Sequence, residues 1–135
     1  MIVDGAFVWT RFPNDERPRQ PGPRHVGYIL GLYHDAAGQR PAVVAYTSSQ
    51  AWTAERVPPG VVIFDALEAT ALDGQKAFVL YLNRLARLPL TERWFPDIRS
   101  ATQGVVAVLS QRRHDSCLQI VADLHMRRLL RFSGP

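Results

Sequence analysis

This chain contains a succession of short apolar segments with strand-like composition, and turn residues end each of them. That pattern leaves few folds open to the chain. Runs rich in β-branched and aromatic residues predict strands over residues 4–12, 25–33, 41–48, 61–64, 76–82, 85–88 and 104–109. Residues 66–72 fit either a short helical turn or an irregular crossing, and the proline-rich residues 13–23 predict an exposed, semi-extended loop. Strands this short at this spacing favour a small barrel or a strongly curved antiparallel sheet.

The spacing of apolar residues changes near the C-terminus. From Ser110 to Arg131 they recur at steps of three and four, as on one face of a helix. Arginines crowd the predicted last turn, where complementing the helix dipole explains them better than DNA binding does. We therefore predict a single mainly β (α+β) domain over residues 1–135, with strands within about 4–109 and a C-terminal helix over about 110–131.

Composition narrows the class of protein. The chain is 47% hydrophobic and 21% charged, which excludes a disordered tail protein or a coiled coil. It has no apolar stretch of the roughly 20 residues that span a bilayer, and no signal-peptide pattern at its start. The single cysteine, Cys117, allows no intrachain disulfide, so a cytoplasmic location is expected. One cysteine with four scattered histidines gives no zinc pattern, so neither a metal nor another cofactor is expected.

The cations of this chain are nearly all arginine. Lys76 is the only lysine among 16 cationic residues, and the net charge is +4. Such arginine usage fits either a GC-rich genome or the recognition of phosphates and base edges, and composition leaves both open. The charge is compatible with a polyanionic partner without requiring one.

Two polar segments are candidates for chemistry, since the chain lacks Walker, GxGxxG, GxSxG and HExxH motifs. A Pro-Gly-Pro turn delivers Arg24 and His25 to the start of a predicted strand, although a solvated arginine after a turn is an equally good reading. Thr47 and Ser48 end another strand, where hydroxyls can contact a phosphate or serve ordinary turn chemistry. Cys117, on the apolar helix face, is expected to be buried rather than nucleophilic.

Aromatic residues near arginines form the third candidate feature, because such pairs stack unpaired bases. Trp52 lies in a polar loop and is the best stacking candidate, whereas Trp9 is expected to be half core and half rim. Together with Trp52, the arginines Arg11, Arg84 and Arg87 are the predicted RNA-binding residues.

These segments together resemble the PemK/MazF family of toxin ribonucleases. Gly5–Pro13 resembles the family's opening Gly-x-hydrophobic-Val-Trp strand, and Pro23-Arg24 before an aliphatic strand resembles its Arg-Pro turn. Ala45–Ser48 resembles the strand that ends in the family's Thr or Ser, and Asn83–Pro89 with Trp94-Phe95 resembles a branch of plasmid-maintenance growth inhibitors. The resemblance covers roughly residues 4–96, through short motifs in a matching order.

The resemblance implies an SH3-like barrel with an appended helix, usually a homodimer, that cleaves single-stranded RNA without metal and is held inactive by a cognate antitoxin. By position, Arg24 matches the family's catalytic arginine and Thr47 its catalytic Thr or Ser, with Ser48 as neighbour. Such cleavage uses the RNA's own 2′-hydroxyl, and a fixed guanidinium stabilises the charge that grows on the phosphate.

One position departs from the family pattern. His25 stands where the family commonly has proline after the arginine. A guanidinium stays protonated in proteins and is a poor base, whereas imidazole exchanges protons near neutral pH, so His25 is a candidate general base. The departure leaves two hypotheses open: an endoribonuclease rebuilt around a histidine, or a catalytically inactive SH3-like module that binds RNA or a protein peptide.

Overall fold

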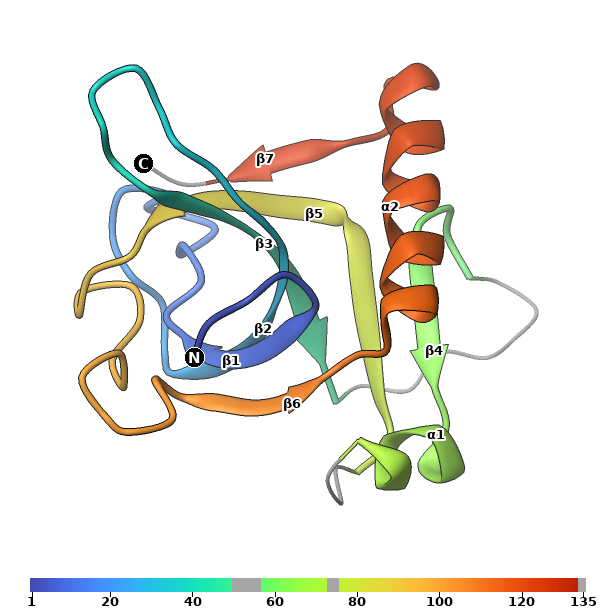
Figure 1. Cartoon of the computed structure of the whole chain (residues 1–135). Coiled ribbons are helices and arrows are strands. Elements are labelled where there is room, and N and C mark those ends of the chain that lie inside the picture. Colours follow the sequence, from blue (N-terminus) through green and yellow to red (C-terminus); the bar gives the residue numbers. More distant parts are fainter. Residues whose placement is uncertain (50–56, 73–75, 134–135) are drawn as a thin grey trace.

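The computed structural model describes residues 1–49, 57–72 and 76–133. The elements are β1 (Ala6–Thr10), β2 (His25–Leu32), β3 (Pro41–Ser48), β4 (Val61–Phe64), α1 (Ala66–Ala71), β5 (Phe78–Pro89), β6 (Val105–Val108), α2 (Gln111–Met126) and β7 (Arg131–Ser133). Within the described ranges the strands form a seven-stranded sheet of order β4-β5-β3-β2-β1-β6, with β7 pairing β5. All pairs are antiparallel except β5 with β7. Figure 1 shows the sheet curling into a half-barrel.

The curved antiparallel sheet with its C-terminal helix confirms the predicted mainly β fold class. Strands β3 and β4 have the predicted bounds, whereas β1 and β6 are shorter than predicted. The open alternative at residues 66–72 is settled in favour of a helix, α1. Asp65 caps this helix, since its side chain accepts the Glu68 N–H at 2.9 Å.

A single bent strand, β5, replaces the two strands predicted at residues 76–82 and 85–88. Both halves pair with β3, but the register shifts between them: Ala45 lies opposite Leu85, and the next residue, Tyr46, lies opposite Tyr81. The intervening residues 82–84 therefore form a bulge, which bends a strand without ending it. The bulge places Arg84 at the bend, beside the end of β3.

The C-terminal helix ends earlier than residue 131, where the helical spacing of apolar residues predicted its end. Ser110 caps its start, accepting the Arg113 N–H at 3.3 Å, and Met126 is its last residue. Arg128 adopts a φ of 57°, a left-handed conformation typical of a helix end. Residues Arg131–Ser133 form β7, a strand that sequence analysis missed. Arg131 therefore lies in a strand rather than in the last helical turn.

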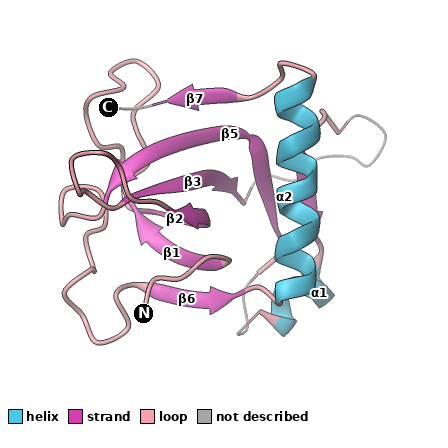
Figure 2. Cartoon of the chain, turned by 45° about the horizontal axis from the view of Figure 1, so that its top comes forward, coloured by secondary structure: helices cyan, strands magenta, loops and turns pink. Residues whose placement is uncertain are grey.

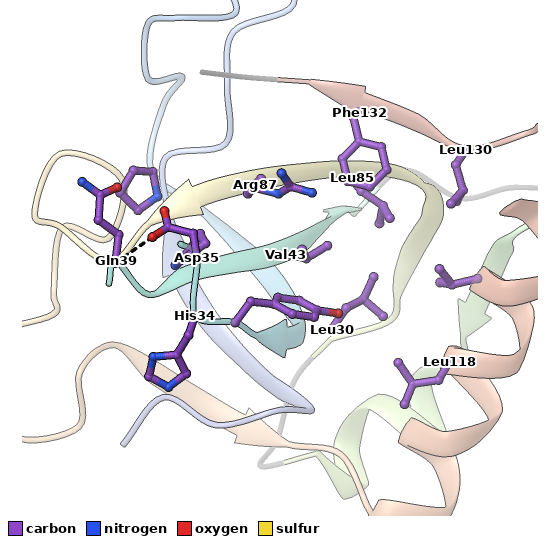
Figure 3. Close-up of a pocket in the computed structure, with 14 residues that line it drawn as sticks. Leu30, His34, Asp35, Gln39, Val43, Leu85, Arg87, Leu118, Leu130 and Phe132 are labelled. Atoms are coloured by element: carbon purple, nitrogen blue, oxygen red, sulfur yellow. Dashed lines mark hydrogen bonds between the residues drawn. The ribbon is translucent and has the colours of Figure 1, made fainter. Parts of the chain in front are cut away.

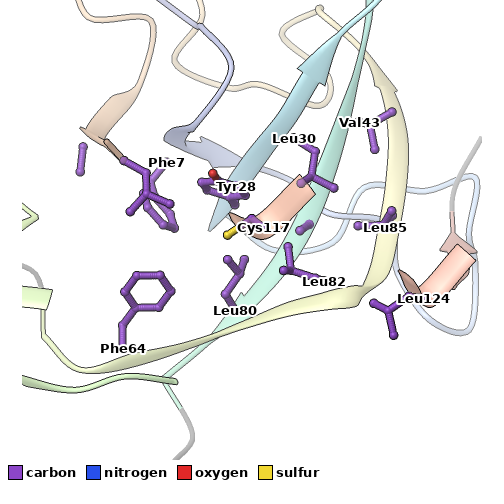
Figure 4. Packing of buried hydrophobic residues seen from close by; sticks show 13 residues of the cluster. Phe7, Tyr28, Leu30, Val43, Phe64, Leu80, Leu82, Leu85, Cys117 and Leu124 are labelled. Carbon is purple, nitrogen blue, oxygen red and sulfur yellow. The ribbon is translucent and has the colours of Figure 1, made fainter. Parts of the chain in front are cut away.

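Alternation along the strands divides the core into two clusters. Phe7 of β1 belongs to the cluster beneath α2, whereas its neighbour Val8 belongs to the second cluster, with Trp94 and Phe95. Figure 2 shows α2 running across the ends of the curved strands. Cys117 joins the first cluster and is 2% exposed, which confirms its predicted burial (Figure 4).

Candidate functional site

The predicted site residues of β1, β2 and β3 meet where these three strands lie side by side. Trp9 of β1 pairs with Val26 of β2, and the Thr47 hydroxyl of β3 donates to the Val26 carbonyl at 2.6 Å. Together with His25 and Ser48, these residues border a cavity of about 390 Å³, here called the central pocket. Its volume lies in the range of small-ligand sites.

His25 is held firmly at the edge of the central pocket. It is the first residue of β2, and its Nε2 lies 2.5 Å from the Thr47 carbonyl oxygen and 3.4 Å from the Thr47 hydroxyl. Its ring stacks on Tyr46, with centroids 5.4 Å apart. Because a carbonyl only accepts, Nε2 carries the hydrogen, and in the neutral ring Nδ1 is the nitrogen with a free lone pair. The imidazole is therefore oriented with a basic nitrogen directed away from Thr47.

Thr47 is a buried residue whose hydroxyl already has a partner. The side chain is 4% exposed, and its hydrogen is donated to the Val26 carbonyl. To donate to a phosphate, this hydroxyl would have to leave a strand carbonyl without its bond. The geometry supports an indirect role for Thr47, which orients His25 through its carbonyl group.

Arg24 lies just outside the central pocket, separated from it by Trp9. The guanidinium carbon stands 4.0 Å from the centre of the Trp9 ring, and NH2 pairs with Asp97 Oδ2 at 2.5 Å. The Arg24 side chain is 45% exposed. Stacking and pairing hold the charged group at the rim while leaving it accessible to a ligand.

Arg84 lies at the bulge of β5. Its guanidinium carbon lies 4.2 Å from the Tyr46 ring centre and 5.2 Å from that of Phe12. It forms an ion pair with Asp15 of the β1–β2 loop. Arg84, Asp15 and His25 border a second cavity of about 430 Å³, here called the loop pocket. His25 borders both cavities.

The β1–β2 loop folds back on itself, in contrast to the semi-extended loop that was predicted. The Asn14 side chain accepts the N–H groups of Glu16 at 2.9 Å and Arg17 at 3.2 Å, and Gly22 N–H bonds to the Phe12 carbonyl at 2.9 Å. A Cβ at Gly22 would lie 2.5 Å from that carbonyl oxygen, so only glycine permits the closure. The closed loop brings its acidic tip onto β5.

Two predicted RNA-binding residues, Arg87 and Arg11, lie apart from this cluster. Arg87 borders a separate, mainly apolar cavity of about 660 Å³ between the β2–β3 hairpin, α2 and β7. Figure 3 shows Arg87 on β5, with Phe132 of β7 nearby and Leu118 on the far side. Arg11 is half-buried and donates its backbone N–H to Trp94, without bordering the central or loop pocket. Trp52 lies outside the described residues.

Sequence analysis did not identify the two aspartates that pair with Arg24 and Arg84, nor the aromatic ring of Tyr46. Asp97 and Asp15 lie far along the chain from the arginines they pair with, and no local pattern signals such pairs. Tyr46 contacts both His25 and Arg84, and its position next to Thr47 was the available signal. Alternation directs Tyr46 to the opposite face of the sheet from Thr47.

Buried polar groups also occur beneath α2, away from the site. The Tyr28 hydroxyl shares a hydrogen bond with His114 Nδ1. Burial raises the pKa of the Tyr28 phenol, with a smaller contribution from Cys117. Burial also raises the pKa of the Cys117 thiol, which keeps it in the unreactive protonated form. His114 is 3% exposed.

The described residues show neither a metal-binding cluster nor a membrane-spanning helix. Among the described residues, no group of three or more His, Cys, Asp or Glu side chains is arranged to hold a metal ion. No helix in the described part of the chain is long and apolar enough to cross a membrane. No protein-family model matches the chain, and no curated protein matches it significantly. Function is therefore inferred from the residues and their geometry.

Proposed function

We propose that this protein is a PemK/MazF-type endoribonuclease that cleaves single-stranded RNA without metal in the cytoplasm. The observation that carries the proposal is an oriented imidazole, His25, that borders two pockets, together with the guanidinium of Arg24, which stacks on Trp9 in the wall of the central pocket. A base and a fixed cation are the two groups that 2′-hydroxyl attack requires. The order of the family-like segments adds independent support.

In the proposed reaction, RNA supplies its own nucleophile. His25 Nδ1 takes the proton from a 2′-hydroxyl, and the 2′-oxygen attacks the adjacent phosphorus. The bond from phosphorus to the 5′-oxygen breaks, that oxygen takes up a proton from water, and protonated His25 returns its proton to the solvent, which leaves a 2′,3′-cyclic phosphate and a 5′-hydroxyl. Arg24 stabilises the charge on the non-bridging oxygens, contributing on the order of 3 kcal/mol.

The hydroxyl residues take supporting roles in this scheme. Thr47 holds the His25 ring through its carbonyl oxygen and ties β3 to β2 through its hydroxyl. Ser48 borders the central pocket next to it, within reach of a bound nucleotide. Arg84 borders the loop pocket together with His25, so that an RNA strand bound there meets a second guanidinium group.

Expression of the protein with a matched pair of variants tests the proposal. Wild-type protein is expected to arrest growth and degrade cellular RNA, whereas Arg24→Ala is expected to lose about 10²-fold in cleavage rate and to be tolerated. Arg99→Ala removes an equal charge from an exposed surface pair with Glu92 and is expected to behave as wild type. Colony counts and total RNA integrity are the readouts.

Two outcomes contradict the proposal. Harmless expression of the wild type, with purified protein leaving RNA intact in EDTA, excludes the activity. Full cleavage by Arg24→Ala keeps the activity but removes Arg24 from its assigned role.

A second candidate function is a non-catalytic module that binds RNA or a protein peptide. The observation that favours it is that both the Thr47 hydroxyl and the Arg24 guanidinium already have internal partners. This function predicts salt-sensitive RNA binding without product, because phosphate contacts weaken as counterions compete. Any turnover of a labelled oligoribonucleotide excludes it.

The family resemblance also carries proposals about protein partners. By this resemblance we expect a homodimer and control by a cognate antitoxin. Light scattering on the purified chain measures the first, and rescue of growth by a co-expressed neighbouring small reading frame tests the second.

A further inference from the structure

Two arginines of the proposed site, Arg24 and Arg84, are each paired with an acidic residue of the same chain. Arg24 pairs with Asp97, and Arg84 pairs with Asp15. A polyanion that enters the site must therefore compete with carboxylates that already occupy the cations. The two pairs differ in how easily the carboxylate can leave.

Asp97 is the better-held acid. Its side chain is 31% exposed, its backbone carbonyl accepts the Ser100 N–H at 3.0 Å, and its Cβ lies so close to Gly104 that a Cβ added there would be 3.1 Å away. Asp15, by contrast, is 66% exposed at the tip of the β1–β2 loop. Because water screens an exposed pair, the Asp15 carboxylate is bound weakly. It is the carboxylate that an incoming anion displaces more easily.

Arg84, unlike Asp15, is held in place by its surroundings. Its side chain is only 19% exposed and lies over the rings of Tyr46 and Phe12. Its Nε is sealed from solvent and has no hydrogen-bond partner among the described residues. These contacts do not involve Asp15, so the guanidinium keeps its position when the carboxylate leaves. A fixed guanidinium is a preorganised site for a phosphate group.

The loop pocket provides room for such a group beside the reactive centre. Asp15 and Arg84 both border it, and its volume of about 430 Å³ admits a small ligand. His25 forms part of the wall shared with the central pocket. A nucleotide chain bound at His25 can therefore place a phosphate group at Arg84, which borders the same cavity.

We propose that the Asp15–Arg84 ion pair is a displaceable latch over a second RNA subsite, where a phosphodiester group of single-stranded RNA replaces the Asp15 carboxylate. This proposal rests on the RNA-binding function proposed above. One anion exchanges for another on an unchanged cation, so no covalent step is involved. In the absence of RNA, the latch closes the β1–β2 loop onto β5 and lowers the affinity of the site for other anions.

Binding of a fluorescein-labelled 2′-O-methyl oligonucleotide, which has no free 2′-hydroxyl and cannot be cut by the proposed reaction, tests the latch. Asp15→Asn removes the competing charge with little change of shape and is expected to tighten binding by about two- to fivefold. Glu92→Gln is the matched control, because it makes the same change in net charge at the exposed Glu92–Arg99 pair. Its affinity is expected to stay within about 1.5-fold of the wild type, since salt screens distant charges.

Arg84→Gln separates the latch from other effects of the loop. Losing one phosphate contact is expected to weaken binding and to reduce the slope of log K against log salt by about 0.7. Adding Asp15→Asn to this variant is then expected to have no further effect. If Arg84→Gln is poorly folded by circular dichroism, Asp15→Asn and Glu92→Gln alone decide the question.

Several results would overturn the latch. The first is an unchanged affinity in Asp15→Asn, and the second is a tightening in Glu92→Gln equal to that in Asp15→Asn. The third is that Asp15→Asn tightens binding equally in the Arg84→Gln protein, and the fourth is that none of the proteins binds the oligonucleotide. Because the probe is not cleaved, the result is distinguishable from failure of the proposed activity. If the protein shows the predicted binding pattern but never cuts RNA, the latch is supported and the nuclease activity is excluded. If it cuts RNA but its affinity does not change in Asp15→Asn, the nuclease activity is supported and the latch is excluded.

Discussion

At the scale of single residues, His25 is the group on which the chemistry depends. One ring nitrogen donates to the Thr47 carbonyl and one ring face stacks on Tyr46, so the orientation of the imidazole is fixed by two contacts from β3. Its neighbour Arg24 is fixed by Trp9 and Asp97. The two groups follow one another in sequence but are positioned by different parts of the fold.

The role of Thr47 gives a prediction at this scale. Thr47→Val leaves the Val26 carbonyl without its donor and is expected to destabilise the fold by about 1–2 kcal/mol while reducing cleavage less than Arg24→Ala does. Thr47→Ser keeps the hydroxyl and is expected to keep most of both properties. Urea unfolding and the cleavage rate of folded protein are the measurements. A Thr47→Val protein as stable as wild type but as inactive as Arg24→Ala would show instead that the hydroxyl takes part in the chemistry.

At the scale of elements, the packing of β2 against α2 contains a polar cluster sensitive to alkaline pH. Tyr28 of β2 bonds to His114 of α2, and burial raises the pKa values of both the Tyr28 phenol and the Cys117 thiol. The folded protein therefore holds these protons more tightly than the unfolded chain does. The resulting stability is fully present below the ordinary pKa of a cysteine and is lost as the pH rises above it.

We expect the free energy of unfolding to fall between about pH 8 and 10.5, by up to about 1.4 kcal/mol per pH unit for each proton. Tyr28→Phe removes the phenol proton, whose contribution begins near the ordinary tyrosine pKa of about 10, and is expected to flatten only the upper end of the profile, at a cost of about 1–2 kcal/mol at neutral pH from the lost bond to His114. Urea unfolding across this pH range measures both effects. A flat wild-type profile would contradict them.

The elements also show what sequence could and could not predict. The bounds of β3 and β4 follow from local composition, because Pro41 and Gly60 mark their starts. The continuity of β5 does not follow from local composition, because its two halves are joined by their common pairing with β3 across a bulge. The strand β7 was missed because it depends on pairing with β5, and its residues alone read as the end of a helix.

At the scale of the whole molecule, the half-barrel brings distant segments together at the start of β2. Sequence order placed Arg24, His25 and Thr47 among the candidates. The pairing of β2 with β3 explains why His25 and Thr47 lie close, whereas Arg24 stacks on Trp9 of β1. The acids that neutralise Arg24 and Arg84 come from other loops, so neither their positions nor the loop pocket followed from local motifs. Arg87 borders a different cavity, which leaves the cluster around His25 as the proposed site of cleavage.

The most direct test of the central claim is mass spectrometry of the ends left on a single-stranded RNA after incubation with purified protein in EDTA. The account predicts fragments that end in a 2′,3′-cyclic phosphate and begin with a 5′-hydroxyl, with no cut at a linkage whose 2′-hydroxyl is replaced by hydrogen. Intact RNA, or fragments that begin with a 5′-phosphate, would contradict it.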